Sequence, residues 1–354
     1  MLSFWFLLSA VLAYFGTELT IGLSRRFRLM DWPNPRSSHT AAIPRLGGVG
    51  ILCGFYFSLA GAALFAQSGL VLQGFIPRDA FLLVLVGGGM AVTGLYDDLR
   101  GLSPAMKFLF ELIPAAFVAA EGIRLESVSI PFAPPIYFSL WSIPVTVLWL
   151  VAFSNIFNFM DGIDGMAGGT AFVYAGFLFL FAWLEGVPGV GFGALLLAGS
   201  SLGFLCHNFP QARTFMGDVG SLFLGMLLAF LVVRLGQQAP QPATLMALLL
   251  AFSVYLYDCG YTLLRRLWRR ENIFRAHRSH LYQRLVQVGW THARVTSFYV
   301  LMHLVVGSLA LLYVRVSNTA QGAIITLTCA LLAGVTLTVK QLEKRRFSDR
   351  VRRG

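Results

Sequence analysis

Runs of apolar residues recur along almost the whole chain and are separated by short segments rich in Pro, Gly and charged residues. Most runs approach the roughly 20 residues that a helix needs to cross the hydrocarbon core of a bilayer. The pattern predicts eleven spans, near 2–22, 46–66, 80–95, 105–121, 141–157, 166–184, 191–207, 219–237, 242–264, 295–314 and 320–340. The third, fourth and fifth are short enough to be tilted or partly re-entrant.

Composition agrees with a membrane protein. Hydrophobic residues make up 57% of the chain and charged residues only 12%, about half of what soluble domains carry. The predicted fold class is therefore an all-α polytopic membrane protein. Residues 2–22 are expected to form the first span and not a cleaved signal, because no basic segment precedes them and no small-residue cleavage site follows.

The chain is expected to form one catalytic transmembrane domain over residues 1–340, followed by a basic cytoplasmic tail over 341–354. The Pro-rich segment 130–135 is expected to be an external loop that can form a short hairpin. The four cysteines are scattered through apolar segments without paired spacing, which favours buried thiols over a zinc site or disulfides.

Lysine and arginine are distributed very unevenly between the predicted loops. If the N-terminus lies outside and the spans alternate, 23 of the 27 Lys and Arg residues fall on the inner side. Cytoplasmic loops of helical membrane proteins carry such an excess, so the count predicts an outer N-terminus and a cytoplasmic C-terminus. The net charge of +11 is accordingly attributed to a surface facing anionic lipid and not to nucleic-acid binding.

Five aspartates form three clusters beside apolar runs. They are Asp97, Asp98, Asp161, Asp164 and Asp218. An Asp at the centre of a membrane helix costs about 2.5–3.5 kcal/mol, so acids in such positions are functional candidates by default. The alternation that places the basic loops inside places all five aspartates there too, although the charge count did not use them. This convergence predicts one shared cytoplasmic site.

Clustered carboxylates next to cations suit a hard divalent metal and a phosphate-bearing substrate. Magnesium takes one or two carboxylates and completes its shell with water and phosphate oxygens, with Mn²⁺ as an alternative. Lys107, Arg100 and the arginine-rich segment 265–270 provide positive charge for phosphate. The glycines beside the aspartates let a ligand approach the backbone where the next helix begins.

Each feature has a structural alternative when it is taken alone. An Asp pair at a helix end is often a solvated turn, and Asp161 and Asp164 are suitable caps for the next span. Glu111 and Asp258 lie inside predicted spans, where we expect interhelical hydrogen bonds or ion pairs. Only the joint pattern favours a catalytic site.

Several motifs occur in a characteristic order. They are Asp31-Trp32-Pro33-Asn34, Arg36-Ser37-Ser38-His39, Arg45-Leu46-Gly47-Gly48, Tyr96-Asp97-Asp98, Asn155 and Asn158 before Asp161-Gly162 and Asp164-Gly165, Asn208-Phe209-Pro210, Phe215-Met216-Gly217-Asp218, and Phe274-Arg275-Ala276-His277-Arg278-Ser279-His280. In order and spacing they resemble the polyprenyl-phosphate N-acetylhexosamine-1-phosphate transferase superfamily (glycosyltransferase family 4), and in particular its O-antigen-initiating branch. The resemblance covers about residues 31–290.

The resemblance implies a bundle of ten or eleven helices in the bacterial inner membrane with a cytoplasmic active site. It implies that Asp218 binds Mg²⁺, that Asp97 and Asp98 are catalytic beside the metal and the lipid phosphate, and that His280 acts near the pyrophosphate. The substrate-binding residues expected on this basis, with Phe215 stacking on uracil, are Asn158, Asp161, Asp164, Asn208, Phe215, Lys107 and Arg45.

The implied reaction transfers an N-acetylhexosamine 1-phosphate from a UDP-sugar to undecaprenyl phosphate, releases UMP and initiates O-antigen or other cell-envelope polysaccharide. UDP-GlcNAc and 6-deoxy amino sugars such as UDP-N-acetylfucosamine both fit. Direct attack by the lipid phosphate and a covalent phospho-Asp route both stay open, as does the oligomeric state, a homodimer included.

The chain departs from the family pattern at two places. Leu99-Arg100-Gly101 replaces a third acid that some members have after the Asp pair. His280-Leu281-Tyr282-Gln283 has one histidine where the peptidoglycan enzyme has several, which argues against a peptidoglycan precursor as substrate.

Two rival functions remain. A lipid-carrier transporter or flippase predicts inverted repeats and midplane charges, which the sequence does not show. A membrane scaffold gives no reason to gather five aspartates on one face.

Overall fold

The computed structural model describes residues 1–33, 41–66, 77–272 and 277–353. Asn34, the motif residues 36–39 and the motif residues 274–276 lie outside this part of the chain. The helices are α1 (Leu2–Phe27), α2 (Gly48–Ala66), α3 (Pro77–Arg100), α4 (Pro104–Ala120), α5 (Ser142–Phe159), α6 (Met166–Leu184), α7 (Pro188–Asn208), α8 (Gly217–Gln238), α9 (Thr244–Ala251), α10 (Ser253–Trp268), α11 (Leu281–Gln287), α12 (His292–Tyr313) and α13 (Asn318–Arg353).

The all-α polytopic fold is confirmed. Over the described residues, nine helices are long and apolar enough to cross a membrane, and the pair α9 and α10 makes a tenth if it is one bent span. The remaining predicted span, near 105–121, corresponds to α4, which has only 17 residues. The orientation of the termini stays a prediction.

The boundaries differ from expectation at functionally important places. Helix α3 extends to Arg100 and includes the Asp97-Asp98 pair, and α8 begins at Gly217 and includes Asp218. The ninth predicted span is divided into α9 and α10, which meet at an angle of 65°, a bend that the sequence did not indicate. Helix α13 continues as one helix from the bundle to Arg353.

Short strands occur only in two small hairpins within the described residues. Strands β1 (Met30–Asp31) and β2 (Ile43–Pro44) pair antiparallel before α2. Strands β3 (Ser127–Val128) and β4 (Ile136–Tyr137) pair on either side of the Pro-rich segment. The segment is therefore the loop of a short hairpin, as the sequence suggested. A short 3-10 helix, Ser139–Trp141, leads into α5.

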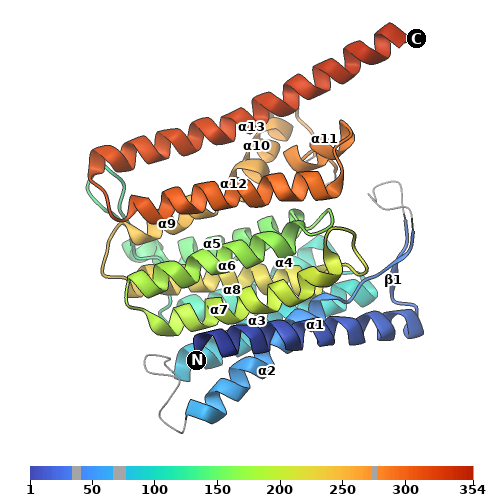
Figure 1. Cartoon of the computed structure of the whole chain (residues 1–354). Coiled ribbons are helices and arrows are strands. Elements are labelled where there is room, and N and C mark those ends of the chain that lie inside the picture. The colour runs from blue at the N-terminus through green and yellow to red at the C-terminus, as the bar shows by residue number, and fades with distance from the viewer. Residues whose placement is uncertain (34–40, 67–76, 273–276, 354) are drawn as a thin grey trace.

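Helix α8 forms the centre of the bundle and is buried along almost its whole length. It packs against α3 and α5, while α1, α2, α6 and α7 surround this group and α12 and α13 form the far side (Figure 1). Small residues allow the closest contacts: a Cβ added to Gly203 of α7 would lie 2.1 Å from the Ala10 carbonyl oxygen of α1. Such side-chain-free contacts let membrane helices approach closely.

Candidate active site

The predicted site residues all lie at one end of the bundle. Asp97 and Asp98 are in the last turn of α3, Lys107 is in the first turn of α4, and Asn158 is at the end of α5. Asp218 is in the first turn of α8, the central helix. Because the helices α3, α4, α5 and α8 pack as antiparallel neighbours, residues distant in sequence meet at this end.

Asp98 holds the start of α8 in place. Its side chain is fully buried, and its two oxygens accept hydrogen bonds from the backbone N–H groups of Asp218 (3.1 Å) and Val219 (3.0 Å). The Arg45 guanidinium lies 3.0 Å from the same carboxylate. A helix begins with unpaired N–H groups and a partial positive charge, both of which a carboxylate satisfies. Asp98 thereby fixes the backbone that carries Asp218.

Lys107 connects two carboxylates from different helices. Its ammonium group lies 3.1 Å from Asp97 and hydrogen-bonds to Asp218. The second Asp218 oxygen accepts from the Asn158 amide (3.0 Å), which also donates to the Ser221 hydroxyl (2.8 Å). The side chains of Asp97 and Asp218 are 16% and 22% exposed, so this pair is open to a ligand whereas Asp98 is not.

Glu111 extends the acidic cluster one turn deeper. Its buried carboxylate accepts a hydrogen bond from Asn155, which confirms the interhelical contact expected for it. Its other oxygen has no partner among the described residues. Sequence reasoning did not assign Glu111 to the site, although its i, i+4 spacing from Lys107 puts both on one face of α4.

The segment that precedes α2 packs directly on the segment that precedes α8. The Phe215 N–H donates to the Pro44 carbonyl (2.8 Å), and the Gly47 N–H donates to the Phe215 carbonyl (2.9 Å). Gly217 adopts a φ of +69°, and a Cβ there would lie 2.5 Å from an Asp98 oxygen. Only glycine combines that backbone conformation with so close an approach. Phe215 is half-buried at this junction.

The loop between α5 and α6 brings Asp161 and Asp164 to the same end. Burial, together with the charges of Asp218, Asp98 and Asp164, raises the pKa of Asp161 to about 7. Asp164 lies 3.3 Å from His292 at the start of α12, a contact that no sequence pattern indicated. These two acids therefore have different surroundings: Asp164 has a basic partner, and we find no ion pair of Asp161 among the described residues.

Asn208 uses its side chain to join two loops. Its amide oxygen accepts from the Gly165 N–H (2.8 Å), and its amide nitrogen donates to the Thr214 carbonyl (2.9 Å). It is 4% exposed. Asn208, predicted to bind the nucleotide, is thus buried between the two loops, where it positions the segments carrying Asp164 and Phe215.

His280 lies at the start of α11, beside the same α5–α6 loop. Two residues further on, the Tyr282 hydroxyl donates to the Phe159 carbonyl (3.1 Å). A Cβ on Gly162 would lie 2.1 Å from that hydroxyl oxygen, so the loop and α11 are in direct contact. The His280 ring itself is buried and lies 3.4 Å from Asp258 of α10. Asp258 has the buried polar contacts expected for it.

The donor set is compatible with magnesium. No group of three or more His, Cys, Asp or Glu side chains arranged to hold a metal is found in the part of the chain described, but Mg²⁺ needs only one or two carboxylates. Asp97 and Asp218 already share one cation, Lys107. Asp161 and Glu111 also interact with Asp218, so the cluster has more carboxyl groups than nearby cations. An additional cation would balance this excess.

Comparisons with known proteins identify the family. Residues 80–236 match the profile of Glycosyl transferase family 4. The chain is 31% identical over 329 residues to the decaprenyl-phosphate N-acetylglucosaminephosphotransferase of Mycobacterium leprae, an alignment covering 86% of this chain and 81% of that protein. It is 27% identical over 288 residues to the probable undecaprenyl-phosphate N-acetylglucosaminyl 1-phosphate transferase of Bacillus subtilis, covering 81% of this chain and 78% of the relative.

A third relative is the phospho-N-acetylmuramoyl-pentapeptide-transferase of Streptococcus pneumoniae, 30% identical over 211 residues, or 56% of this chain and 61% of that protein. Fold, site and relatives together define a multi-pass membrane transferase of sugar phosphates. The chain belongs to Glycosyl transferase family 4, the superfamily of polyprenyl-phosphate hexosamine-1-phosphate transferases.

Proposed function

We propose that this protein transfers N-acetylglucosamine 1-phosphate from UDP-GlcNAc to undecaprenyl phosphate, at the cytoplasmic face of the bacterial inner membrane, and releases UMP. The observation that carries the proposal is the convergence of Asp97, Lys107, Asn158 and Asp218 from four helices at one end of the bundle. A membrane-end cluster of this kind can hold two phosphate groups while a lipid tail stays in the bilayer. A flippase needs no such cluster.

In the proposed reaction, an oxygen of the lipid phosphate dianion forms a bond to the β-phosphorus of the UDP-sugar. The bond from that phosphorus to the bridging oxygen breaks, and UMP leaves as a dianion, so the total charge is unchanged. The protein's contribution is positioning and charge stabilisation, as in other phosphoryl transfers. Asp97 orients the lipid phosphate and accepts its proton when it enters as the monoanion. A phospho-Asp intermediate on Asp97 is the alternative route.

Magnesium is the proposed cofactor, with Mn²⁺ as a substitute, and Asp218 and Asp97 would hold it. When bound, the ion would neutralise pyrophosphate oxygens. Lys107 and Arg45 provide the remaining positive charge near the site. Asp98 and Asn208 support this arrangement through backbone contacts, while Asp161, Asp164 and Phe215 face the nucleotide.

Two observations support N-acetylglucosamine over the other sugars. The Bacillus subtilis and Mycobacterium leprae relatives, each covered over more than three quarters of its length, are named for N-acetylglucosamine transfer. The pentapeptide transferase is matched over a shorter region. A 6-deoxy amino sugar such as N-acetylfucosamine is the second candidate donor. Initiation of O-antigen synthesis is the proposed pathway role.

The test is a transfer assay on the purified full-length protein in nanodiscs, with undecaprenyl phosphate and a panel of labelled UDP-sugars. We expect lipid-linked sugar and UMP in equal amounts, a requirement for Mg²⁺ and a preference for UDP-GlcNAc. Asp218→Asn should reduce turnover by at least about 10³-fold with an unchanged melting temperature, because it removes the proposed metal ligand. Substantial turnover in that variant would refute the metal assignment, and no transfer with any donor would refute the function.

A further inference from the structure

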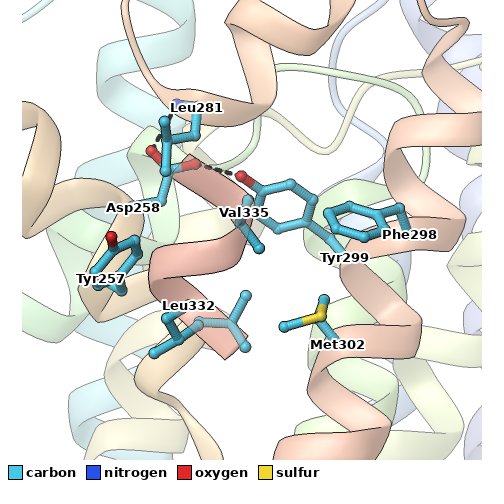
Figure 2. A pocket seen from close by; sticks show the side chains of 9 residues that line it. Tyr257, Asp258, Leu281, Phe298, Tyr299, Met302, Leu332 and Val335 are labelled. Carbon is cyan, nitrogen blue, oxygen red and sulfur yellow. Dashed lines mark hydrogen bonds between the residues drawn. The ribbon is translucent and has the colours of Figure 1, made fainter. Parts of the chain in front are cut away.

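Asp258 is a buried carboxylate that has no role in the reaction proposed above. Asp258 lies in the middle of α10 and is 1% exposed. Its oxygens accept hydrogen bonds from the backbone N–H groups of Leu281 (2.8 Å) and Tyr282 (3.1 Å) and from the Tyr299 hydroxyl (2.6 Å). Figure 2 shows Asp258 between the start of α11 and Tyr299 of α12. Three segments therefore meet on this carboxylate.

Within the residues described, His280 is the one histidine whose ring nitrogen lies close to the Asp258 carboxylate. His280 Nδ1 lies 3.4 Å from Asp258 Oδ1. The ring stacks on Tyr282, and the His280 N–H donates to the Gln283 side chain (3.3 Å). The ring is thus held in one orientation by its own helix and by α10.

The surroundings strengthen the contact. The pocket next to Asp258 is lined mainly by apolar side chains, among them Val254, Phe298, Met302 and Leu332 (Figure 2). Electrostatic attraction is much stronger in such a low-dielectric environment than in water. A carboxylate next to one ring nitrogen keeps a proton on that nitrogen and favours the imidazolium form. The other nitrogen, Nε2, is then left to contact a ligand.

We propose that Asp258 is a positioning residue for the transferase reaction: it keeps the His280 proton on Nδ1, so that Nε2 is presented to the leaving UMP phosphate as a charged hydrogen-bond donor. The inference rests on the proposed function. It is supported by the contact of α11 with the α5–α6 loop through Tyr282 and Gly162, which places His280 next to the loop carrying Asp161.

The groups facing His280 come from several elements. They are Asp258 and Cys259 of α10, His277 of the preceding loop and Tyr282 of α11. Behind them, Arg266 of α10 interacts with His277, and Tyr299 of α12 donates to Asp258. Burial, followed by the charges of His280 and Arg266, lowers the pKa of His277 to about 4. His277 therefore stays neutral near pH 7, and Asp258 is the negatively charged neighbour of His280.

The first test compares Asp258→Asn with the wild type in the transfer assay across pH, with rates scaled to the folded fraction. We expect kcat to fall by about 100-fold while KM for both substrates changes less than about threefold. Removing a carboxylate lowers the pKa of a neighbouring histidine. The decline of kcat at alkaline pH should therefore move to lower pH by about one unit. This decline is assigned to His280 if it is absent in His280→Gln.

Two further variants separate positioning from a structural role. Tyr299→Phe removes one hydrogen bond to Asp258 but leaves its charge, so kcat should fall less than about fivefold and the pH profile should not move. In the His280→Gln background, Asp258→Asn should have almost no further effect on kcat. An additive loss in the double variant, or an unmoved alkaline decline in Asp258→Asn, would show that Asp258 only caps α11.

The second test does not depend on activity. Nitrogen NMR of the full-length protein in nanodiscs, with labelled histidine, reports which ring nitrogen carries a proton. The His280 signals are assigned as those that disappear in His280→Gln. We expect both ring nitrogens to be protonated in the wild type at pH values below the alkaline decline of kcat, and Nδ1 to lose its proton in Asp258→Asn, so that Nε2 alone carries one. An Nε2-only proton in the wild type would overturn the inference. If the spectrum is as expected but no UDP-sugar is used in the transfer assay, the proposed function fails and the positioning of His280 stands.

Discussion

Two helix starts in this protein are held by the same kind of contact but with different partners. Asp98 accepts two consecutive backbone N–H groups at the start of α8, and Asp258 does so at the start of α11. The group beside Asp98 is the guanidinium of Arg45, whereas the group beside Asp258 is the imidazole of His280. A guanidinium keeps its charge at every physiological pH, whereas an imidazole is the side chain that most readily changes its charge in that range.

The difference follows the role of each helix. Helix α8 is the buried central helix and carries Asp218, so its first turn has to stay in place for any ligand to bind. Helix α11 has only seven residues and lies at the edge, against the α5–α6 loop. A short peripheral helix gains little from its own hydrogen bonds, so its position depends on the groups that hold its ends.

The largest effect is expected from breaking the contact at α8. Asp98→Asn leaves the Arg45 charge without its partner and turns an amide N–H₂ toward a backbone donor, which costs about 3 kcal/mol at a buried site. We expect a melting temperature lower by several degrees and a loss of transfer of more than 100-fold even in the folded fraction. Thermal unfolding in nanodiscs and the transfer assay measure the two effects.

A matched control for Asp98 lies at the opposite end of α3. Asp79 of α3 pairs with Arg234 of α8 at 2.8 Å, and both are largely buried. Asp79→Asn should also lower the melting temperature, but activity per folded molecule should stay within about twofold. Equal losses of specific activity in the two variants would contradict a local role for Asp98.

A smaller effect, of opposite sign, is expected at Asp161. Its pKa is raised to about 7 in the folded protein, against about 3.9 in an unfolded chain. Between these values the folded state binds the proton more strongly, so stability decreases as pH rises from about 4 to 7. In ligand-free protein, Asp161→Asn should therefore raise the melting temperature by a few degrees at pH 8 and by almost nothing at pH 4. A gain independent of pH would refute this explanation.

The smallest effect is expected at the second contact of α11. Arg284 makes two hydrogen bonds of 2.7 Å with Glu343 of α13, whose side chain is 39% exposed. Arg284→Lys loses the paired geometry, and partly exposed ion pairs contribute only about 1 kcal/mol. We expect a melting temperature lower by about 2 °C and kcat within twofold of the wild type. A larger loss of kcat than in Asp258→Asn would show that α13, and not α10, holds α11.

Much of the architecture was predictable because it depends on local hydropathy. All eleven predicted apolar runs are helical, and the Pro-rich segment is the loop of a short hairpin, as expected. The break between α9 and α10 at Phe252 was not predictable, since the residues around it form an unbroken apolar run without Pro or Gly. That break depends on packing against neighbouring helices.

The site was predictable in its members and not in its contacts. The sequence alone determined that the aspartates of three separate clusters would reach one end of a helical bundle, because apolar run lengths set the number of crossings between them. Only the tertiary structure decided that Asp98 is buried against α8, that Lys107 joins Asp97 to Asp218, and that Asp258 holds His280. These pairings depend on distances of a few ångströms between helices, which are set by side-chain packing across the whole bundle and not by any local pattern.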